Sequence, residues 1–201
     1  MDSSKKIIIP PYFGPISLWT EIYNSKIIWD IHQNYNKQSY RNRTFIHSAN
    51  GLQKLTVPIK HSLFKFSFKD SLIDNTTGWQ KNHWKSIKIA YSSSPYFEYY
   101  KDSLRDLFSK KHVKLLDLNM DIIKIVSKWL EIELKNEFTK EYKESYSVGI
   151  DLRNSINHKN KTQKLIANYT QVFSNKNGFI NDLSIIDLIF NEGPNSLSFL
   201  K

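Results

Sequence analysis

The chain contains no cysteine among its 201 residues, and this absence excludes several classes of protein at once. A disulfide scaffold, a cysteine nucleophile, an iron–sulfur cluster and a cysteine-ligated zinc site all require thiols. No apolar run approaches the roughly 18 residues that cross a bilayer. The three consecutive isoleucines near the N-terminus are too few for a signal-peptide core. We therefore expect a cytoplasmic protein without an integral membrane segment.

Familiar phosphate, metal and nucleophile motifs are also missing from the sequence. It contains neither G-x-G-x-x-G, G-x-x-x-x-G-K-[ST] nor G-x-S-x-G, which removes the common dinucleotide, P-loop and hydrolase fingerprints. The six histidines have no spacing that suits zinc. We expect no metal and no cofactor. A Ser-His-Asp triad is not excluded, because its members need not be close in sequence.

What the chain does have is aromatic residues and positive charge. Hydrophobic residues make up 40%, aromatic residues 14% and charged residues 24%, which is typical of a globular protein. The length and the lack of a linker predict one domain over residues 1–201. The net charge of +10 favours an anionic partner. Alternatively, AT-rich codons, which supply Lys, Asn and Ile, account for part of this excess.

The N-terminal part has the pattern of a βαβ unit. Strands are expected over 6–9 and 26–31, separated by a proline-rich loop and a helix that Ser17 can cap. A hairpin is expected next, because Asn50-Gly51 lies between two β-branched runs, 44–48 and 52–59. The alternation of Phe64, Phe66 and Phe68 with polar residues predicts a further strand.

From Gly78 onward the apolar period becomes helical. It predicts helices over 79–92, from Pro95 to Phe108 and over 117–134. Strands are expected near 139–143 and over 169–173. A short last helix is expected to begin at Asp182 or Ser184 and to end at Gly193-Pro194.

The densest polar stretch, residues 34–43, directly follows the second predicted strand. Ligands of open α/β sheets bind at such strand ends. Lys37, Arg41 and Arg43 can hold a phosphate or carboxylate, while Gln38 and Asn42 suit a sugar or amide. The alternative is a solvated loop, since the stretch lacks phosphate-loop glycines.

His83, followed by Trp84, lies inside a predicted helix. Histidine is a common general acid or base, but His83 shares a helix face with Trp79 and Ile87. A half-buried structural histidine is therefore an equal alternative. Nucleic-acid binding is disfavoured, because the aromatic residues lie at core-like positions and no helix has a basic recognition face.

Several segments, in the same order along the chain, resemble the WbqC-like protein family. The matching runs are Pro10-Pro11-Tyr12-Phe13-Gly14-Pro15, Asp30, 37–43, Asn50-Gly51, 55–60, Trp79, Lys81, His83-Trp84, Tyr91, Pro95-Tyr96-Phe97, Tyr169, Gln171, Phe173 and 179–194. Two departures stand out. Many members have His-Gln-Pro where this chain has Ile8-Ile9-Pro10, and the region 139–168 is short.

The resemblance implies a cytoplasmic step in making bacterial surface polysaccharide such as O-antigen, with transfer of an acyl, aminoacyl or glycosyl-type group to an activated amino sugar. The alternatives are a non-catalytic binding or scaffolding subunit and a nucleic-acid-binding protein. The expected partner is a small anionic substrate such as a nucleotide sugar or acyl donor; the oligomeric state stays open.

The expected fold is α/β: a three-layer, Rossmann-like, partly parallel sheet with an antiparallel hairpin insertion and C-terminal helices. The predicted site joins four distant segments. His83, Asp187 and Asp30 are the candidate catalytic residues. The candidate substrate-binding residues are Tyr12, Phe13, Gly14, Lys37, Gln38, Arg41, Asn42, Arg43, Lys60, Trp84, Asn181 and Ser184.

Overall fold

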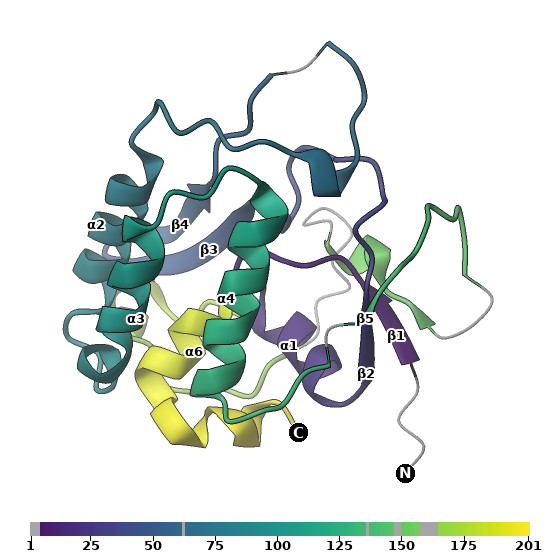
Figure 1. Ribbon diagram of the computed structural model, residues 1–201. Helices are drawn as coiled ribbons and strands as arrows, with labels where there is room; N and C mark the ends of the chain where they lie inside the picture. The colour runs from purple at the N-terminus through teal and green to yellow at the C-terminus, as the bar shows by residue number, and fades with distance from the viewer. Residues whose placement is uncertain (1–4, 62, 136, 147–149, 157–164) are drawn as a thin grey trace.

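The computed structural model of the protein describes residues 5–61, 63–135, 137–146, 150–156 and 165–201. The expected βαβ unit is confirmed at the N-terminal end of the chain (Figure 1). It consists of strand β1 (Lys5–Ile8), helix α1 (Ile16–Tyr23) and strand β2 (Lys26–Trp29). β1 and β2 pair in parallel, with Ile8 opposite Trp29. Parallel neighbours need a crossover of this kind, and α1 supplies it.

Two very short strands complete the parallel sheet. β5 (Glu137–Phe138) pairs with β2, and β6 (Ile150–Asp151) pairs with β1, which gives the strand order β5-β2-β1-β6. The prediction of a strand over 139–143 was wrong in position, since pairing ends at Phe138. β6 was not predicted, because a two-residue strand has no periodic signal.

The predicted hairpin is confirmed as a separate antiparallel pair, β3 (Arg43–Ser48) and β4 (Gly51–Thr56). Gly51 has φ 86° directly after the turn, a conformation that glycine adopts without steric cost. The strand predicted through Phe64, Phe66 and Phe68 is wrong. Phe68 instead begins a 3₁₀ helix, η1 (Phe68–Asp70), and the preceding segment joins residues 33–35 through an isolated bridge, Asn34 to Ser67, rather than a ladder.

Four longer helices follow the predicted apolar periods, although the helix predicted over 117–134 covers only residues 115–129. They are α2 (Trp79–Tyr91), α3 (Phe97–Ser109), α4 (Leu115–Trp129) and α6 (Ile185–Glu192). The strand predicted over 169–173 is wrong, because Tyr169 and Gln171 lie in an irregular segment and turn their polar groups toward buried partners. Shorter helical segments are η2 (Arg153–Ile156), α5 (Ser174–Asn177) and η4 (Gly193–Phe199).

The start of α1 is capped from a distant part of the chain. The helix begins at Ile16, one residue before the predicted cap Ser17. The backbone N–H and the hydroxyl of Ser17 both donate to the Asp182 carboxylate, each at 2.8 Å. An acidic side chain at this end satisfies free N–H groups and opposes the helix dipole. Asp182 therefore fixes the C-terminal segment against the βαβ unit.

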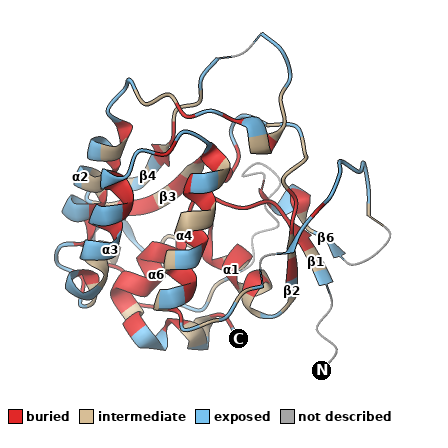
Figure 2. Ribbon diagram, in the orientation of Figure 1, coloured by how far each residue is buried: buried red, intermediate tan, exposed pale blue. Residues whose placement is uncertain are grey.

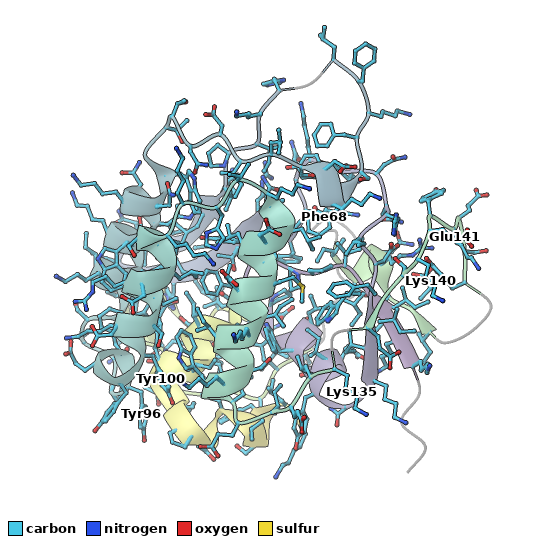
Figure 3. All side chains as sticks on the ribbon, in the orientation of Figure 1. Phe68, Tyr96, Tyr100, Lys135, Lys140 and Glu141 are labelled. Atoms are coloured by element: carbon cyan, nitrogen blue, oxygen red, sulfur yellow. The ribbon has the colours of Figure 1, made fainter. Side chains whose placement is uncertain are left out.

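Buried side chains connect all of these elements. One hydrophobic cluster runs from Ile8 through the hairpin and the helices to Leu200, and Figure 2 shows buried residues on facing sides of the helices and strands. Tyr100 on α3, labelled in Figure 3, packs its ring against Phe190 of α6. The molecule is thus a mixed α/β fold with a parallel four-stranded sheet, a separate antiparallel hairpin and C-terminal helices.

Candidate functional site

Two loops that are far apart in sequence are held together beside the hairpin. The backbone N–H of Tyr35 donates to the carbonyl of Phe66 at 2.9 Å, and that of Phe68 donates to Gln33 at 2.8 Å. On the other side, Asn42 and Val57 exchange two hydrogen bonds: Val57 N–H donates to the Asn42 carbonyl, and the Asn42 side chain donates back. These bonds position the loop after β2 against the segment after β4.

Between these segments lies a pocket of about 470 Å³, which we call the basic pocket. It is lined by Tyr35, Lys37, Gln38, Asn42, Arg43, Thr56, Val57, Pro58, Ile59, Lys60, His61, Leu63, Phe64, Lys65 and Phe66. Five of the predicted substrate-binding residues are therefore brought together here: Lys37, Gln38, Asn42, Arg43 and Lys60. At its rim Gln38 has φ 66°, a left-handed conformation that is uncommon for a non-glycine residue.

The charge of the basic pocket has one sign. Four of its lining residues are lysine or arginine, and none of the described lining residues carries a carboxylate. The sequence explains this, because the stretch from residue 31 to residue 69 contains seven Lys and Arg and no Asp or Glu. A concave surface lined by one sign of charge attracts counter-ions of the other sign. The pocket therefore favours an anion.

An aromatic pair forms part of the pocket lining. The rings of Tyr35 and Phe66 stack with centroids 5.4 Å apart and an interplanar angle of 10°. Burial raises the pKa of Tyr35 to about 12, although the nearby Arg41 and Arg43 act in the opposite direction. The tyrosine hydroxyl thus stays protonated at neutral pH, and the pair offers an apolar surface for a ring.

Three polar atoms of the pocket lining have no hydrogen-bond partner among the described residues, although they are buried. They are Asn42 Oδ1, Arg43 Nε and Thr56 Oγ1. Asn42 is only 6% exposed. A buried polar group without a partner costs roughly 1–3 kcal/mol, and a bound molecule can supply the missing partner. Together these atoms offer one acceptor, one donor and one hydroxyl that can act as either.

Arg41, two residues from Arg43, does not line the pocket. It is only 2% exposed, and its guanidinium donates to Ser39 Oγ at 3.1 Å and to Gln33 Oε1 at 2.7 Å. Its Nε, like that of Arg43, is buried without a partner among the described residues. Burial lowers its pKa to about 10. Arg41 therefore forms part of the structure behind the loop rather than a surface that a ligand reaches.

His83 lies in a closed aromatic environment. Its Nδ1 is 2.7 Å from the Tyr12 hydroxyl, and its ring packs edge-on against Trp79 and Phe108. Burial lowers the pKa of His83 to about 4, and the Thr56 backbone opposes this only in part. The imidazole is thus neutral at physiological pH, and it does not line the basic pocket.

Asp187 is the centre of a second buried network. The hydroxyls of Tyr91 and Tyr169 donate to its two carboxylate oxygens, each at 2.6 Å. Gln171 connects Tyr169 to His47, with its Nε2 donating to the Tyr169 hydroxyl and its Oε1 lying 3.2 Å from His47 Nδ1. Burial raises the pKa of Asp187 to about 6, while the two tyrosine hydroxyls lower it. This network joins α2, α6 and the segment before α5.

Asp30 forms a third network at the carboxyl end of β2. Its carboxylate accepts hydrogen bonds from Arg153, from the Thr139 hydroxyl and from the backbone N–H of His32. Arg153 is itself buried and also pairs with Asp151 of β6. The three candidate catalytic residues thus lie in three different networks, each bonded to its own partners. The convergence of His83, Asp187 and Asp30 expected from the sequence does not occur.

The remaining predicted residues lie in the core or at its border. Phe13 and Tyr12 are fully buried and pack edge to face. Gly14 and Ser184 lie in two paired segments, where the Ile185 N–H donates to the Gly14 carbonyl. These residues connect the βαβ unit to α6. Trp84 stacks on Phe97, and the Asn181 side chain accepts from the Ile166 backbone.

Sequence reasoning missed several residues of the basic pocket, namely Tyr35, Thr56, His61, Lys65 and Phe66. Two signals were available. The stretch from residue 31 to residue 69 contains no acidic residue and marks the whole positive region. The alternation of aromatic residues near Phe66 predicts a buried strand, but it belongs to a partly exposed loop. The described residues contain no cluster of His, Cys, Asp or Glu suited to a metal ion, and no helix among them has the length and apolarity to span a bilayer.

Comparisons with known proteins identify a distant relative and a protein family. A relative from Mycobacterium tuberculosis (strain ATCC 25618 / H37Rv), described as Uncharacterized protein Rv1507c, is 27% identical over 220 residues, covering 94% of this chain and 91% of its own length. No solved structure matches the chain significantly. The WbqC-like protein family matches residues 10–159, which is well over half of the chain and includes every residue of the basic pocket. The chain therefore belongs to the WbqC-like protein family.

Proposed function

We propose that the basic pocket binds a phosphate-activated sugar, and that the protein acts in a cytoplasmic step of bacterial surface polysaccharide biosynthesis such as that of O-antigen. The observation that carries this proposal is the combination of lysine and arginine side chains with buried polar atoms that have no protein partner. Positive charge suits the phosphates, and the unpartnered Asn42 Oδ1 suits a hydroxyl or amine of the sugar or base.

The pocket has the volume and the functional groups to bind both the phosphates and the rings of such a molecule. Arg43 and Lys60 can hold a diphosphate, since guanidinium and ammonium groups donate to phosphate oxygens. The stacked rings of Tyr35 and Phe66 offer an apolar surface to a nucleobase or sugar ring. Ligand sites commonly combine apolar walls with a few polar groups that fix orientation.

A transferase reaction in this pocket would use His61 rather than His83. When the nitrogen of an amino sugar attacks the acyl carbon of a thioester donor, a C–N bond forms, the carbon–sulfur bond breaks and the amine loses a proton. Histidine is well suited to accept that proton and to pass it to the departing thiolate. His61 lines the pocket, whereas His83 is bonded to Tyr12 in the core. In this proposal, transfer of an acyl or aminoacyl group to the bound sugar depends on His61.

A non-catalytic binding or scaffolding subunit is the second candidate. The burial of His83 and Asp187 away from the basic pocket favours it, because both are satisfied by protein partners. The two candidates share the ligand and differ in whether it is converted. Loss of turnover with retained binding in a His61→Ala variant would support the transferase.

Titration calorimetry with a panel of nucleoside diphosphate sugars tests the proposed ligand. We expect Arg43→Ala and Lys60→Ala to weaken binding on the order of 10-fold to 100-fold, because each removes a charged hydrogen-bond donor. Arg105→Ala on α3 and Lys88→Ala on α2 are matched controls, since both residues are exposed and lie outside the pocket. Equal losses in the controls, or binding of RNA alone with a steep salt dependence, would contradict the proposal.

A further inference from the structure

The loop between β4 and η1 projects from the body of the molecule, at the top of Figure 1. It carries the two adjacent apolar side chains Leu63 and Phe64, which are 100% and 82% exposed. Single exposed apolar residues are common on soluble proteins, but a fully exposed leucine beside a largely exposed phenylalanine at a projecting tip forms an apolar patch of the kind found at interaction sites. In Figure 2 the projecting part of this loop, residues 60–61 and 63–65, has the colour of exposed residues.

Two lysines flank this apolar tip. Lys60 precedes Leu63 and Lys65 follows Phe64, and both are exposed. The first acidic residue after the loop, Asp70, lies at its base, where it accepts the Ser67 hydroxyl at 2.5 Å. Asp74 lies near Lys60 and is bonded to Thr76. The tip thus presents apolar groups at its end and cations directly behind them.

We propose that this tip docks the protein on the surface of an anionic lipid bilayer. Leu63 and Phe64 enter the boundary between headgroups and acyl chains, and Lys60 and Lys65 meet the lipid phosphates. Apolar side chains combined with lysines are the arrangement that binds proteins to the bilayer interface. No membrane-spanning helix is needed for this mode of attachment.

The composition of the tip favours a bilayer over a nucleic acid. RNA-binding surfaces place aromatic rings beside cations so that bases stack on them, and an aliphatic Leu63 adds nothing to such stacking. In a bilayer both residues contribute in the same way, through removal of apolar surface from water. Because Leu63 and Phe64 also line the basic pocket, docking at the tip would place the pocket at the lipid surface.

Vesicle flotation with the full chain tests this inference, using phosphatidylcholine vesicles with and without phosphatidylglycerol. We expect the wild-type protein to float with the anionic vesicles. The double variant Leu63→Ser/Phe64→Ser is expected to lower the partition constant on the order of 100-fold, from the lost apolar transfer. Lys60→Ala and Lys65→Ala are each expected to lower it about 5-fold, with a weaker salt dependence.

The matched control is Ile89→Ser/Tyr99→Ser, which removes two exposed apolar side chains from α2 and α3. It should float like the wild type. Failure of the wild type to bind anionic vesicles overturns the inference, as does an equal loss in the control. Binding to an RNA oligonucleotide without binding to vesicles would do the same. No nucleotide sugar is present in this assay, so its outcome is independent of the proposed ligand.

Discussion

Buried polar side chains behave differently in two regions of this molecule. In the networks around Asp30, His83 and Asp187, donors and acceptors are matched by protein partners at 2.6–3.1 Å. In the lining of the basic pocket, Asn42 Oδ1, Arg43 Nε and Thr56 Oγ1 are buried without such partners. The first region stabilises the fold, and the second is where we propose that a ligand binds.

The difference shows why residue type alone is a weak guide to function. His83 and Asp187 have the chemistry of catalytic residues, yet their neighbours already satisfy them. Asn42 and Thr56 are ordinary polar residues, but their position makes them candidates for ligand contacts. Four substitutions, ordered from the largest expected effect to the smallest, sharpen this comparison.

Arg153→Ala should have the largest effect, because it leaves the carboxylate of Asp30 buried without a counter-ion. Removal of one partner of a buried ion pair typically costs about 3–5 kcal/mol. Urea unfolding followed by circular dichroism measures the loss. Arg105→Ala breaks an exposed pair with Asp102 and should cost less than about 1 kcal/mol. Similar losses in both variants would show that Asp30 is not a structural anchor.

His83→Gln should change how stability depends on pH. The folded pKa of His83 is about 4, below the ordinary 6.5, so the unfolded chain binds the proton more readily between these values. Wild-type stability is therefore lost as pH falls from 6.5 to 4, by roughly 3 kcal/mol at 1.36 kcal/mol per pH unit. The free energy of unfolding of the variant, measured by urea unfolding at a series of pH values, should lack this pH-dependent loss. A wild-type curve parallel to that of the variant would argue against a buried neutral imidazole.

Asp187→Asn should change the same profile in the opposite direction. The folded pKa of Asp187 is about 6, above the ordinary 3.8, so the folded chain binds the proton more readily in this interval. Its contribution is fully present below pH 3.8 and is lost as pH rises to 6, by roughly 3 kcal/mol. Relative to the wild type, the variant should lose less stability over this rise. An unchanged slope of stability against pH would indicate that the Asp187 carboxylate is accessible to water.

Arg41→Ala gives the smallest of these changes and separates the two regions most directly. Removal of this buried side chain should lower stability by about 2 kcal/mol through the cavity that it leaves, with little effect on ligand affinity. Arg43→Ala, two residues away, should weaken ligand binding with little effect on stability. Thermal unfolding and calorimetry on the two variants provide the comparison. A loss of affinity in Arg41→Ala without a loss of stability would place Arg41 in the site.

Much of the fold follows from local patterns. The β-branched runs around a crossover helix, the hairpin and the apolar periods of α2, α3, α4 and α6 appear in the structure. Gly51, however, begins β4 instead of lying in the turn, and α4 ends at Trp129, before the predicted end at residue 134. The secondary-structure prediction failed where the same alternation of apolar and polar residues fits both a strand and a loop. Phe64, Phe66 and Phe68 alternate like a strand, but Phe64 lies in the projecting loop and Phe68 begins η1. Among the described residues, a single bridge between Asn34 and Ser67 joins this segment to residues 33–35.

The candidate site could be predicted only in part. The run from Lys37 to Arg43 was identified as a polar stretch that follows a predicted strand, and Lys60 was included with the family resemblance. The pocket contains Lys37, Gln38, Asn42, Arg43 and Lys60. Arg41 could not be separated from Arg43 in this way, because burial depends on the packing of Gln33 and Ser39 around one guanidinium and not the other. The same holds for His83, whose partner Tyr12 lies 71 residues earlier in the chain.

The sequence by itself determined the family, the α/β class and the sign of the net charge, since these depend on composition, order and local periodicity. Only the tertiary structure decided which buried polar groups are paired and which have no partner among the described residues. That distinction depends on contacts between distant segments, and hydrogen-bonding atoms act over about 3 Å, a distance that no local pattern in the chain encodes.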